Sequence, residues 1–281
     1  MPRKVEFPRS ILVETTLRCP ADCVFCPNKK VQGRPLDMSW DLFKKVVDEC
    51  RGKGLQEFCP FIHGEPLAYP RIENALDYLS HNLPETPIQV YTNGYLLDRQ
   101  KISLLLGSNL GGIHFSIDGV SKEVYERHRR GLDYGRVMAN ILGFLDSCRK
   151  AQREIDTRVV LTLTPENDAE IEAFRLLWNG LVDVVDVIPC DGRGGEGRLP
   201  AAPEARMLGC LHVPYRTYIL SDGSVVPCCK DWAGYTVMGN VARESLQSIW
   251  DSTVYRRFRE EVGRGIFSNF EVCSRCISDS L

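Results

Sequence analysis

The 281-residue sequence has no long hydrophobic run and no marked excess of charge of either sign. No stretch approaches the roughly 20 apolar residues of a membrane-spanning helix, and the N-terminal MPRKVEFPRS lacks the apolar core of a signal peptide. A formal net charge of -2 provides no global field that would attract nucleic acid or an anionic membrane. We therefore expect a cytoplasmic protein with no nucleic-acid partner and no membrane partner.

Motifs of common hydrolytic and nucleotide-binding enzymes are also missing. The sequence has no H-E-x-x-H, no recognisable Ser, His and Asp order and no paired carboxylate motif, and its five histidines are scattered. The glycine-rich GRGGEG that begins at Gly192 does not match a P-loop, and we interpret it as part of a linker. Hydrolysis is therefore a weak hypothesis.

Cysteine, by contrast, is abundant, with 12 in the chain. A reducing cytosol keeps thiols free, so metal binding or catalysis explains most of them better than disulfides do. Cys50 and Cys148 are exceptions, because each falls on the apolar stripe of an amphipathic helix and suits a buried packing role.

Short β-branched runs alternate with amphipathic stretches from Ser10 to Pro189. The helical period is clear in 40–51 and 134–150. Strands are predicted in ILVET, LQEFCPFI, IQVYT, GIHFSI, TRVVLTLT and VDVVDVI, which begin at Ile11, Leu55, Ile88, Gly112, Thr157 and Val182. Alternating strands and helices imply an α/β fold with parallel strands, and six units make an incomplete barrel or an open wound sheet. Ligands are expected at the carboxyl ends of the strands.

The pattern breaks after Pro189, where CDGRGGEGRLPAAPEARM is rich in glycine, proline and alanine and predicts a linker. A hairpin is predicted beyond it, with YIL and SVV flanking the turn SDG. One helix is then predicted from Glu244, and its apolar face consists of Leu246, Ile249, Trp250 and Phe258. We therefore predict two domains, 1–195 and 196–281.

Cys19, Cys23 and Cys26 follow the first predicted strand as C-x3-C-x2-C. Thiolates select iron–sulfur clusters or zinc. Structural zinc requires four closed ligands, and no fourth cysteine lies nearby, so a cubane cluster with one open iron fits better. An open iron invites a substrate or a cofactor.

This arrangement resembles the radical S-adenosylmethionine superfamily, and Phe25, before the third cysteine, matches its pattern as well. The resemblance implies a partial (β/α)6 TIM-like barrel in which the three cysteines hold a 4Fe-4S cluster. It further implies that the open iron binds S-adenosyl-L-methionine, and that the resulting 5′-deoxyadenosyl radical abstracts hydrogen from an unactivated C–H bond. An external one-electron reductant such as flavodoxin or ferredoxin is implied in the same way.

Other cofactor contacts are implied by short motifs at later strand ends. HGEP, from His63 to Pro66, resembles the family's G-G-E-P motif, which receives the amino group of the cofactor. Gly64 and Glu65 carry over, whereas His63 stands where the pattern usually has glycine or another small residue.

YTNG and FSIDG, after the third and fourth strands, resemble segments whose polar side chains reach the ribose and the methionine portion. By that match we assign Asn93, Ser116 and Asp118. The stretch SKEVYERHRRG resembles a helix whose late arginine pairs with the cofactor carboxylate. Arg129 fits the usual distance, although Arg130 lies beside it.

A second cysteine set consists of Cys210, Cys228, Cys273 and Cys276. The first two flank the predicted hairpin and the last two follow the predicted helix, so four thiolates can converge on a closed site. Spacing alone leaves zinc and an iron–sulfur cluster equally open. The segment resembles the auxiliary-cluster modules called SPASM and, in shortened form, twitch, which implies one auxiliary 4Fe-4S cluster held by these four residues.

The resemblance is to short twitch enzymes in particular, which favours a small polar substrate such as an aminocyclitol or a sugar over a peptide. We expect a radical oxidoreductase that oxidises a carbinol by two electrons, with the auxiliary cluster accepting one of them. Two alternatives remain within radical chemistry. One is an epimerase, for which Cys190 and Cys229 are the candidate hydrogen donors. The other is an enzyme that modifies a peptide.

A third alternative is a non-catalytic iron–sulfur or zinc protein that transfers electrons. It predicts no cleavage of S-adenosylmethionine under reducing conditions, and it would leave Glu65 and Arg129 without a purpose.

Overall fold

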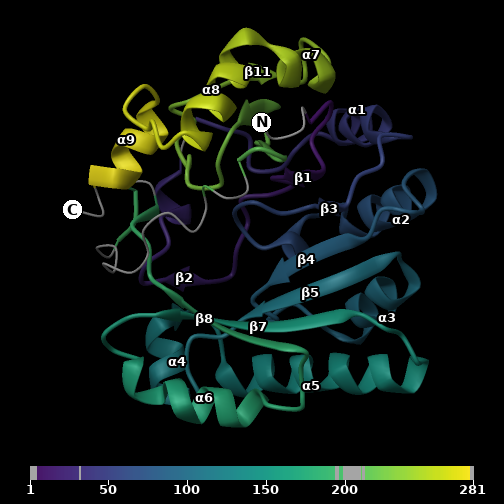
Figure 1. Ribbon diagram of the computed structural model, residues 1–281. Coiled ribbons are helices and arrows are strands. Elements are labelled where there is room, and N and C mark those ends of the chain that lie inside the picture. The colour runs from purple at the N-terminus through teal and green to yellow at the C-terminus, as the bar shows by residue number, and fades with distance from the viewer. Residues whose placement is uncertain (1–4, 32, 194–195, 199–209, 211–212, 279–281) are drawn as a thin grey trace.

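The fold is built on one long, mostly parallel sheet (Figure 1). The computed structural model describes residues 5–31, 33–193, 196–198, 210 and 213–278. Within these residues the sheet has nine strands in the order β11-β10-β9-β1-β3-β4-β5-β7-β8. Because β1, β3, β4, β5, β7 and β8 are parallel neighbours, their carboxyl ends lie along one edge of the sheet.

All six predicted strands are confirmed. They are β1 (Ser10–Val13), β3 (Glu57–Cys59), β4 (Ile88–Thr92), β5 (Leu110–Ser116), β7 (Asp156–Leu163) and β8 (Val184–Pro189). Alternate residues such as Ile11, Phe58 and Phe115 are fully buried in the main hydrophobic core. The predicted partial α/β barrel is therefore correct.

Helices connect the strands and cover one side of the sheet (Figure 1). They are α1 (Trp40–Cys50), α2 (Ile72–Asn82), α3 (Arg99–Gly107), α4 (Lys122–His128), α5 (Tyr134–Ala151) and α6 (Ile171–Trp178). Side chains of Ser39, Asp98, Ser121 and Asp133 accept hydrogen bonds from the first turns of α1, α3, α4 and α5, which explains where these helices begin. Cys50 and Cys148 are buried in the core, as predicted.

Short elements complete this part of the chain. They are β2 (Asp22–Cys23), β6 (Arg129–Arg130) and the 3-10 helices η1 (Asn28–Lys30), η2 (Pro66–Ala68) and η3 (Asp168–Glu170). β2 and β6 form a separate antiparallel ladder. Within the described residues, no helix is long and apolar enough to cross a membrane.

The predicted C-terminal hairpin is confirmed as β9 (Arg216–Ile219) and β10 (Ser224–Val226), which are followed by β11 (Gly239–Asn240). β9 pairs with β1 in parallel, so the hairpin continues the barrel sheet. Gly223 occupies the turn with φ +86°, a conformation that favours glycine. The C-terminal segment is thus joined to the barrel by main-chain hydrogen bonds.

The single helix predicted from Glu244 is wrong, because the structure has two helices there. α7 (Leu246–Asp251) ends at Ser252, where α8 (Thr253–Gly263) begins. Ser252 has extended dihedral angles, φ -60° and ψ 151°, and its side chain accepts a hydrogen bond from Tyr255 N. A serine at this position both terminates one helix and caps the next. The chain continues to α9 (Glu271–Ser278).

Most of the predicted linker lies outside the described residues, namely 194–195 and 199–207. The domain boundary at 195/196 remains a prediction.

Candidate cofactor site

Cys19, Cys23 and Cys26 lie on the loop that follows β1, at the carboxyl edge of the sheet. Burial raises the pKa of Cys19 to about 12, and the charges of Glu65 and the two neighbouring thiols act in the same direction. Burial likewise raises the pKa of Cys23 to about 11. Cys26 N donates a hydrogen bond to Cys23 O at 3.1 Å within the same loop, and binding a metal requires that the thiols lose their protons.

The β2–β6 ladder brings an arginine to these thiols. Cys23 pairs with Arg129 across the ladder, and Arg129 Nη1 lies 3.8 Å from Cys23 Sγ. Arg129 Nε is 2.7 Å from the buried Asp118 Oδ2. Burial alone would lower the pKa of Arg129, but the charge and hydrogen bond of Asp118 together with the charges of Cys23 and Tyr125 raise that pKa above its ordinary value. Arg130, by contrast, is exposed, so the structure places the first arginine of the pair at the thiols.

Phe25 lies beneath two cations. Its ring centroid is 5.8 Å from the guanidinium carbon of Arg129 and 5.6 Å from that of Arg193. The buried ring therefore contacts both the predicted cofactor arginine and a second arginine contributed by the segment after β8.

The HGEP loop approaches the cysteine loop so closely that only glycine fits at its second position. Gly64 has φ +74°, and a Cβ there would lie 2.3 Å from Thr16 O. Glu65 N donates to Arg18 O at 2.7 Å, so the two loops are joined by their main chains. The sequence motif thus reflects a real backbone constraint.

Gly64→Ala should destabilise the protein by about 2–5 kcal/mol, because left-handed strain and steric overlap add. Gly180→Ala is the matched control, since Gly180 has φ +75° with nothing within 4 Å of an added Cβ. It should cost only about 1–2 kcal/mol. Denaturant unfolding of both variants measures the difference, and equal losses would contradict the close approach of the two loops.

The Glu65 carboxylate joins the ends of β3 and β4. It accepts hydrogen bonds from Thr92 Oγ1 at 2.7 Å, Asn93 N at 2.8 Å and Leu67 N at 3.2 Å. Burial raises the pKa of Glu65 to about 7 despite these donors. Asn93 Nδ2 in turn lies 3.7 Å from Cys19 Sγ. The predicted residues Glu65 and Asn93 are therefore brought together beside the first thiol.

Ser116 and Asp118 lie at the end of β5. Ser116 is half-buried, whereas the Asp118 carboxylate is fully buried and accepts a hydrogen bond from Thr162 N at 2.7 Å. Together with its ion pair to Arg129, this bond makes Asp118 the residue that orients the arginine. A contact of either residue with the cofactor remains a prediction.

The second cysteine set is also brought together. Burial raises the pKa of Cys273 to about 12, and the charges of Cys210 and Cys276 add to the effect. Lys230 connects Cys228 to this group, because its main-chain N lies 3.4 Å from Cys228 Sγ and its Nζ lies 3.7 Å from Cys276 Sγ.

Both sets suit clusters better than single ions. Within the described residues, no three His, Cys, Asp or Glu side chains are placed so that they could hold one metal ion. Zinc draws its sulfur ligands to about 2.3 Å from one atom, whereas a cluster distributes them over several irons. The two sets consist of cysteines alone, and thiolates are the ligands that iron–sulfur clusters take.

Charged residues lie between the two cysteine sets. Asp191 Oδ1 is 3.3 Å from Arg193 Nε, and Asp191 Oδ2 is 3.4 Å from Lys230 Nζ. Burial raises the pKa of Asp191, but the two cations outweigh it and keep that pKa below its ordinary value. The charges of Cys26 and Cys229 both raise the pKa of Arg193. Sequence reasoning gave Asp191 and Lys230 no role, because the contact between them joins distant segments of the chain.

The two candidate hydrogen donors differ in accessibility. Cys190 is buried, with 3% of its surface exposed, whereas Cys229 is exposed.

Two histidines lie in different surroundings. His114 is half-buried, and its ring stacks on that of Tyr91 with 4.1 Å between centroids. Burial lowers the pKa of His114 to about 4, so the ring is neutral at pH 7. His63 is buried and its ring contacts the Glu14 carboxylate.

An α/β barrel with three thiols after its first strand and four more in a C-terminal segment is typical of an iron–sulfur protein. Residues 13–177 match the sequence model of the Radical SAM superfamily, and 210–277 match that of an iron–sulfur cluster-binding domain, SPASM. The chain belongs to the radical SAM superfamily. Its cofactors are S-adenosyl-L-methionine and two 4Fe-4S clusters.

Similar proteins act on different substrates. The chain is 21% identical to the S-adenosyl-L-methionine-dependent 2-deoxy-scyllo-inosamine dehydrogenase of Niallia circulans, over 95% of this chain and 91% of that protein. It is 27% identical to a PqqA peptide cyclase of Rhodopseudomonas palustris, over 46% of this chain and only 36% of the cyclase.

Two solved structures share the fold. BtrN in complex with AdoMet and 2-DOIA has a TM-score of 0.66 at 18% identity, covering 96% of this chain and 93% of BtrN. Streptococcus suis SuiB bound to S-adenosylmethionine has a TM-score of 0.75 at 15% identity, covering 90% of this chain and 68% of SuiB.

Proposed function

We propose that the protein is a dehydrogenase that oxidises a carbinol of a small polar molecule, such as an aminocyclitol or a sugar, to a ketone. The observation that carries the proposal is the cluster of charged residues between the two cysteine sets, formed by Asp191, Arg193 and Lys230. A substrate bound against it would lie within reach of both sets. The relative from Niallia circulans, a dehydrogenase that matches nearly all of this chain, supports the same reaction.

Oxidation of a carbinol to a ketone removes one hydrogen atom, one electron and one proton. When bound, the cofactors supply the hydrogen-abstracting radical and an acceptor for the electron. The chain supplies Asp191, a carboxylate kept ionised by two cations, which suits it to accept a hydrogen bond from the substrate hydroxyl. Arg193 and Lys230 can bind further oxygen atoms of the substrate.

The ligands of the first cluster and the residues that bind S-adenosylmethionine are assigned next. We assign Cys19, Cys23 and Cys26 as the ligands of the cluster that binds S-adenosylmethionine. Arg129 is assigned to the cofactor carboxylate, because it is a buried cation beside Cys23 and is oriented by Asp118. The remaining proposed cofactor contacts are Phe25, Gly64, Glu65, Asn93, Ser116 and Asp118.

The second thiol set is assigned to the auxiliary cluster, with Cys210, Cys228, Cys273 and Cys276 as its ligands. Four protein ligands leave that cluster no open iron, so it can accept an electron without binding substrate. An external reductant such as flavodoxin or ferredoxin completes the proposal.

Epimerisation is the second candidate, and the exposed thiol of Cys229 favours it. A thiol beside the substrate could return a hydrogen atom to the opposite face of the substrate radical. The buried Cys190 is less suited to this role. A peptide substrate remains a third candidate, favoured by the peptide cyclases among the relatives.

The experiment supplies aminocyclitols, sugars and peptides deuterated at the reacting carbon to the anaerobically reconstituted enzyme. A dehydrogenase should form ketone and 5′-deoxyadenosine in equal amounts, with the deuterium in 5′-deoxyadenosine. Cys229→Ser should leave this ratio unchanged, because no hydrogen atom has to be returned. An inverted product carrying a solvent-derived hydrogen, lost in Cys229→Ser, would establish the epimerase instead.

A further inference from the structure

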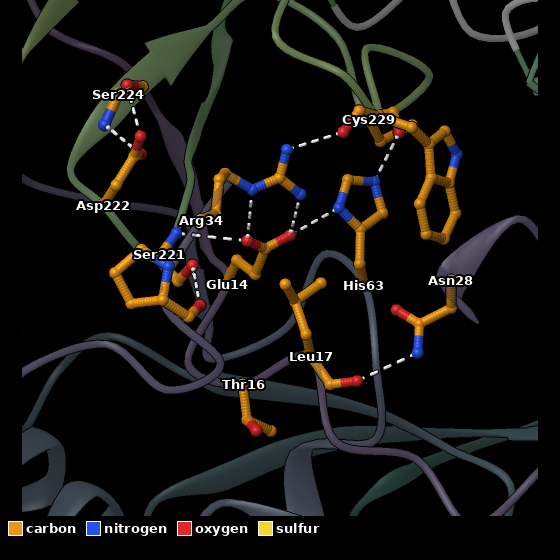
Figure 2. Close-up of polar contacts among 12 residues, drawn as sticks. Glu14, Thr16, Leu17, Asn28, Arg34, His63, Ser221, Asp222, Ser224 and Cys229 are labelled. Atoms are coloured by element: carbon orange, nitrogen blue, oxygen red, sulfur yellow. Dashed lines mark hydrogen bonds and ion pairs between the residues drawn. The ribbon is translucent and has the colours of Figure 1, made fainter. Parts of the chain in front are cut away.

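A fully buried carboxylate lies at the junction of the barrel and the C-terminal segment (Figure 2). Glu14, directly after β1, accepts hydrogen bonds from Arg34 Nε at 3.2 Å and Arg34 Nη2 at 3.1 Å. It also contacts Ser221 N at 3.2 Å and His63 Nδ1 at 2.5 Å. Four donors match the acceptor capacity of a carboxylate, which is the condition for a buried charge to be tolerated.

The two basic side chains of this network also hold the loop that follows Cys228. His63 Nε2 lies 3.0 Å from Cys229 O, and the His63 ring stacks on Trp232 with 3.6 Å between centroids. Arg34 Nη1 donates to Trp232 O at 2.6 Å. A carbonyl oxygen can only accept, so His63 Nε2 is the donor to Cys229. Residues 229 and 232 are therefore both held from the barrel side.

The same histidine begins the HGEP loop. Its neighbour Gly64 lies against Thr16 O, and Glu65 N bonds to Arg18 O, so the backbone at His63 is fixed to the loop that leads to Cys19. Its side chain is fixed to the residue after Cys228. One residue thus connects the loop of the first thiol set with a ligand loop of the second.

We propose that His63 is a positioning residue, which, with Glu14 and Arg34, holds the auxiliary-cluster loop 228–232 at a fixed place relative to the S-adenosylmethionine loop. Transfer of an electron from the substrate to the auxiliary cluster needs that fixed separation, so the role rests on the assignment of Cys228 as a ligand. A small residue at this position cannot make either contact.

The test replaces His63 with phenylalanine, which can still stack on Trp232 but loses both hydrogen bonds. Two lost bonds of about 1 kcal/mol each should speed amide hydrogen exchange in 230–236 of the holoenzyme at least tenfold. These amides report on the loop, because Asp231 N bonds to Cys228 O and Gly234 N bonds to Asp231 O. Exchange in α4 should be unchanged. His81→Phe, at an exposed histidine of α2, is the matched control.

His63→Gln retains a donor and should give intermediate exchange. In His63→Phe the electron paramagnetic resonance signal of the auxiliary cluster should change, while 5′-deoxyadenosine formation persists and oxidised product per 5′-deoxyadenosine falls. Wild-type exchange in 230–236, or an increase spread evenly over the whole chain in both variants, overturns the proposal. Because exchange requires no substrate, failure of the dehydrogenase assignment alone would leave the exchange result intact.

Discussion

Replacing Cys19, Cys23 or Cys26 with alanine should lower the formation of 5′-deoxyadenosine by more than about 100-fold, since even residues behind metal ligands cost 10–100-fold when they are changed. The charges of Cys23 and Cys26 both raise the pKa of Cys19, so removal of one thiol changes the surroundings of the others. The measurement is 5′-deoxyadenosine formed by dithionite-reduced, anaerobically reconstituted enzyme. Iron content should fall by about half, because only one of the two clusters is lost.

Cys148→Ala is the matched control, because Cys148 is buried on α5 and has no part in either thiol set. It should retain full iron content and cleavage. If a variant of the first set cleaved S-adenosylmethionine as fast as the wild-type enzyme, the assignment of the cofactor site would be wrong.

The strands and the cysteine sets were readable from the sequence because they depend on local pattern. Short runs rich in β-branched residues located the six parallel barrel strands, and C-x3-C-x2-C requires only a short loop. The helix from Glu244 failed for a local reason as well, since the capping power of Ser252 was not weighed against the apolar period around it.

Contacts between distant segments could not be predicted from the sequence. The β2–β6 ladder consists of two pairs of residues and leaves no periodic signal, yet it decides that Arg129 and not Arg130 lies beside Cys23. Residues such as Glu14 and Arg34 belong to no motif. Their roles depend on a partner about 200 positions away, Trp232 in the case of Arg34.

His63 shows the limit most clearly. In the sequence it is only a departure from a small residue in the G-G-E-P pattern. In the structure the departure creates contacts with two residues far apart in the sequence, Glu14 and Cys229 (Figure 2). The mismatch at His63 was therefore as informative as the match at Gly64 and Glu65. Its role could be recognised only from the three-dimensional structure.

Replacing Cys228 or Cys276 with alanine should separate cleavage from oxidation. Both thiols contact Lys230 in the second set, away from the thiols of the first. Each variant should lose about half of its iron and still form 5′-deoxyadenosine, but ketone formation should fall by more than about 100-fold. The reason is that the substrate radical would have no acceptor for its second electron. Iron counting and the ratio of ketone to 5′-deoxyadenosine measure both effects.

Cys229→Ala is the matched control for this pair, since Cys229 adjoins Cys228 but is not assigned as a ligand. It should retain its iron and its ketone formation. Undiminished ketone formation in Cys228→Ala, together with loss of iron, would show that the auxiliary cluster does not take the second electron. Asp191 and Lys230 would then still be candidates for binding the substrate, but its second electron would have to go to an acceptor other than the auxiliary cluster.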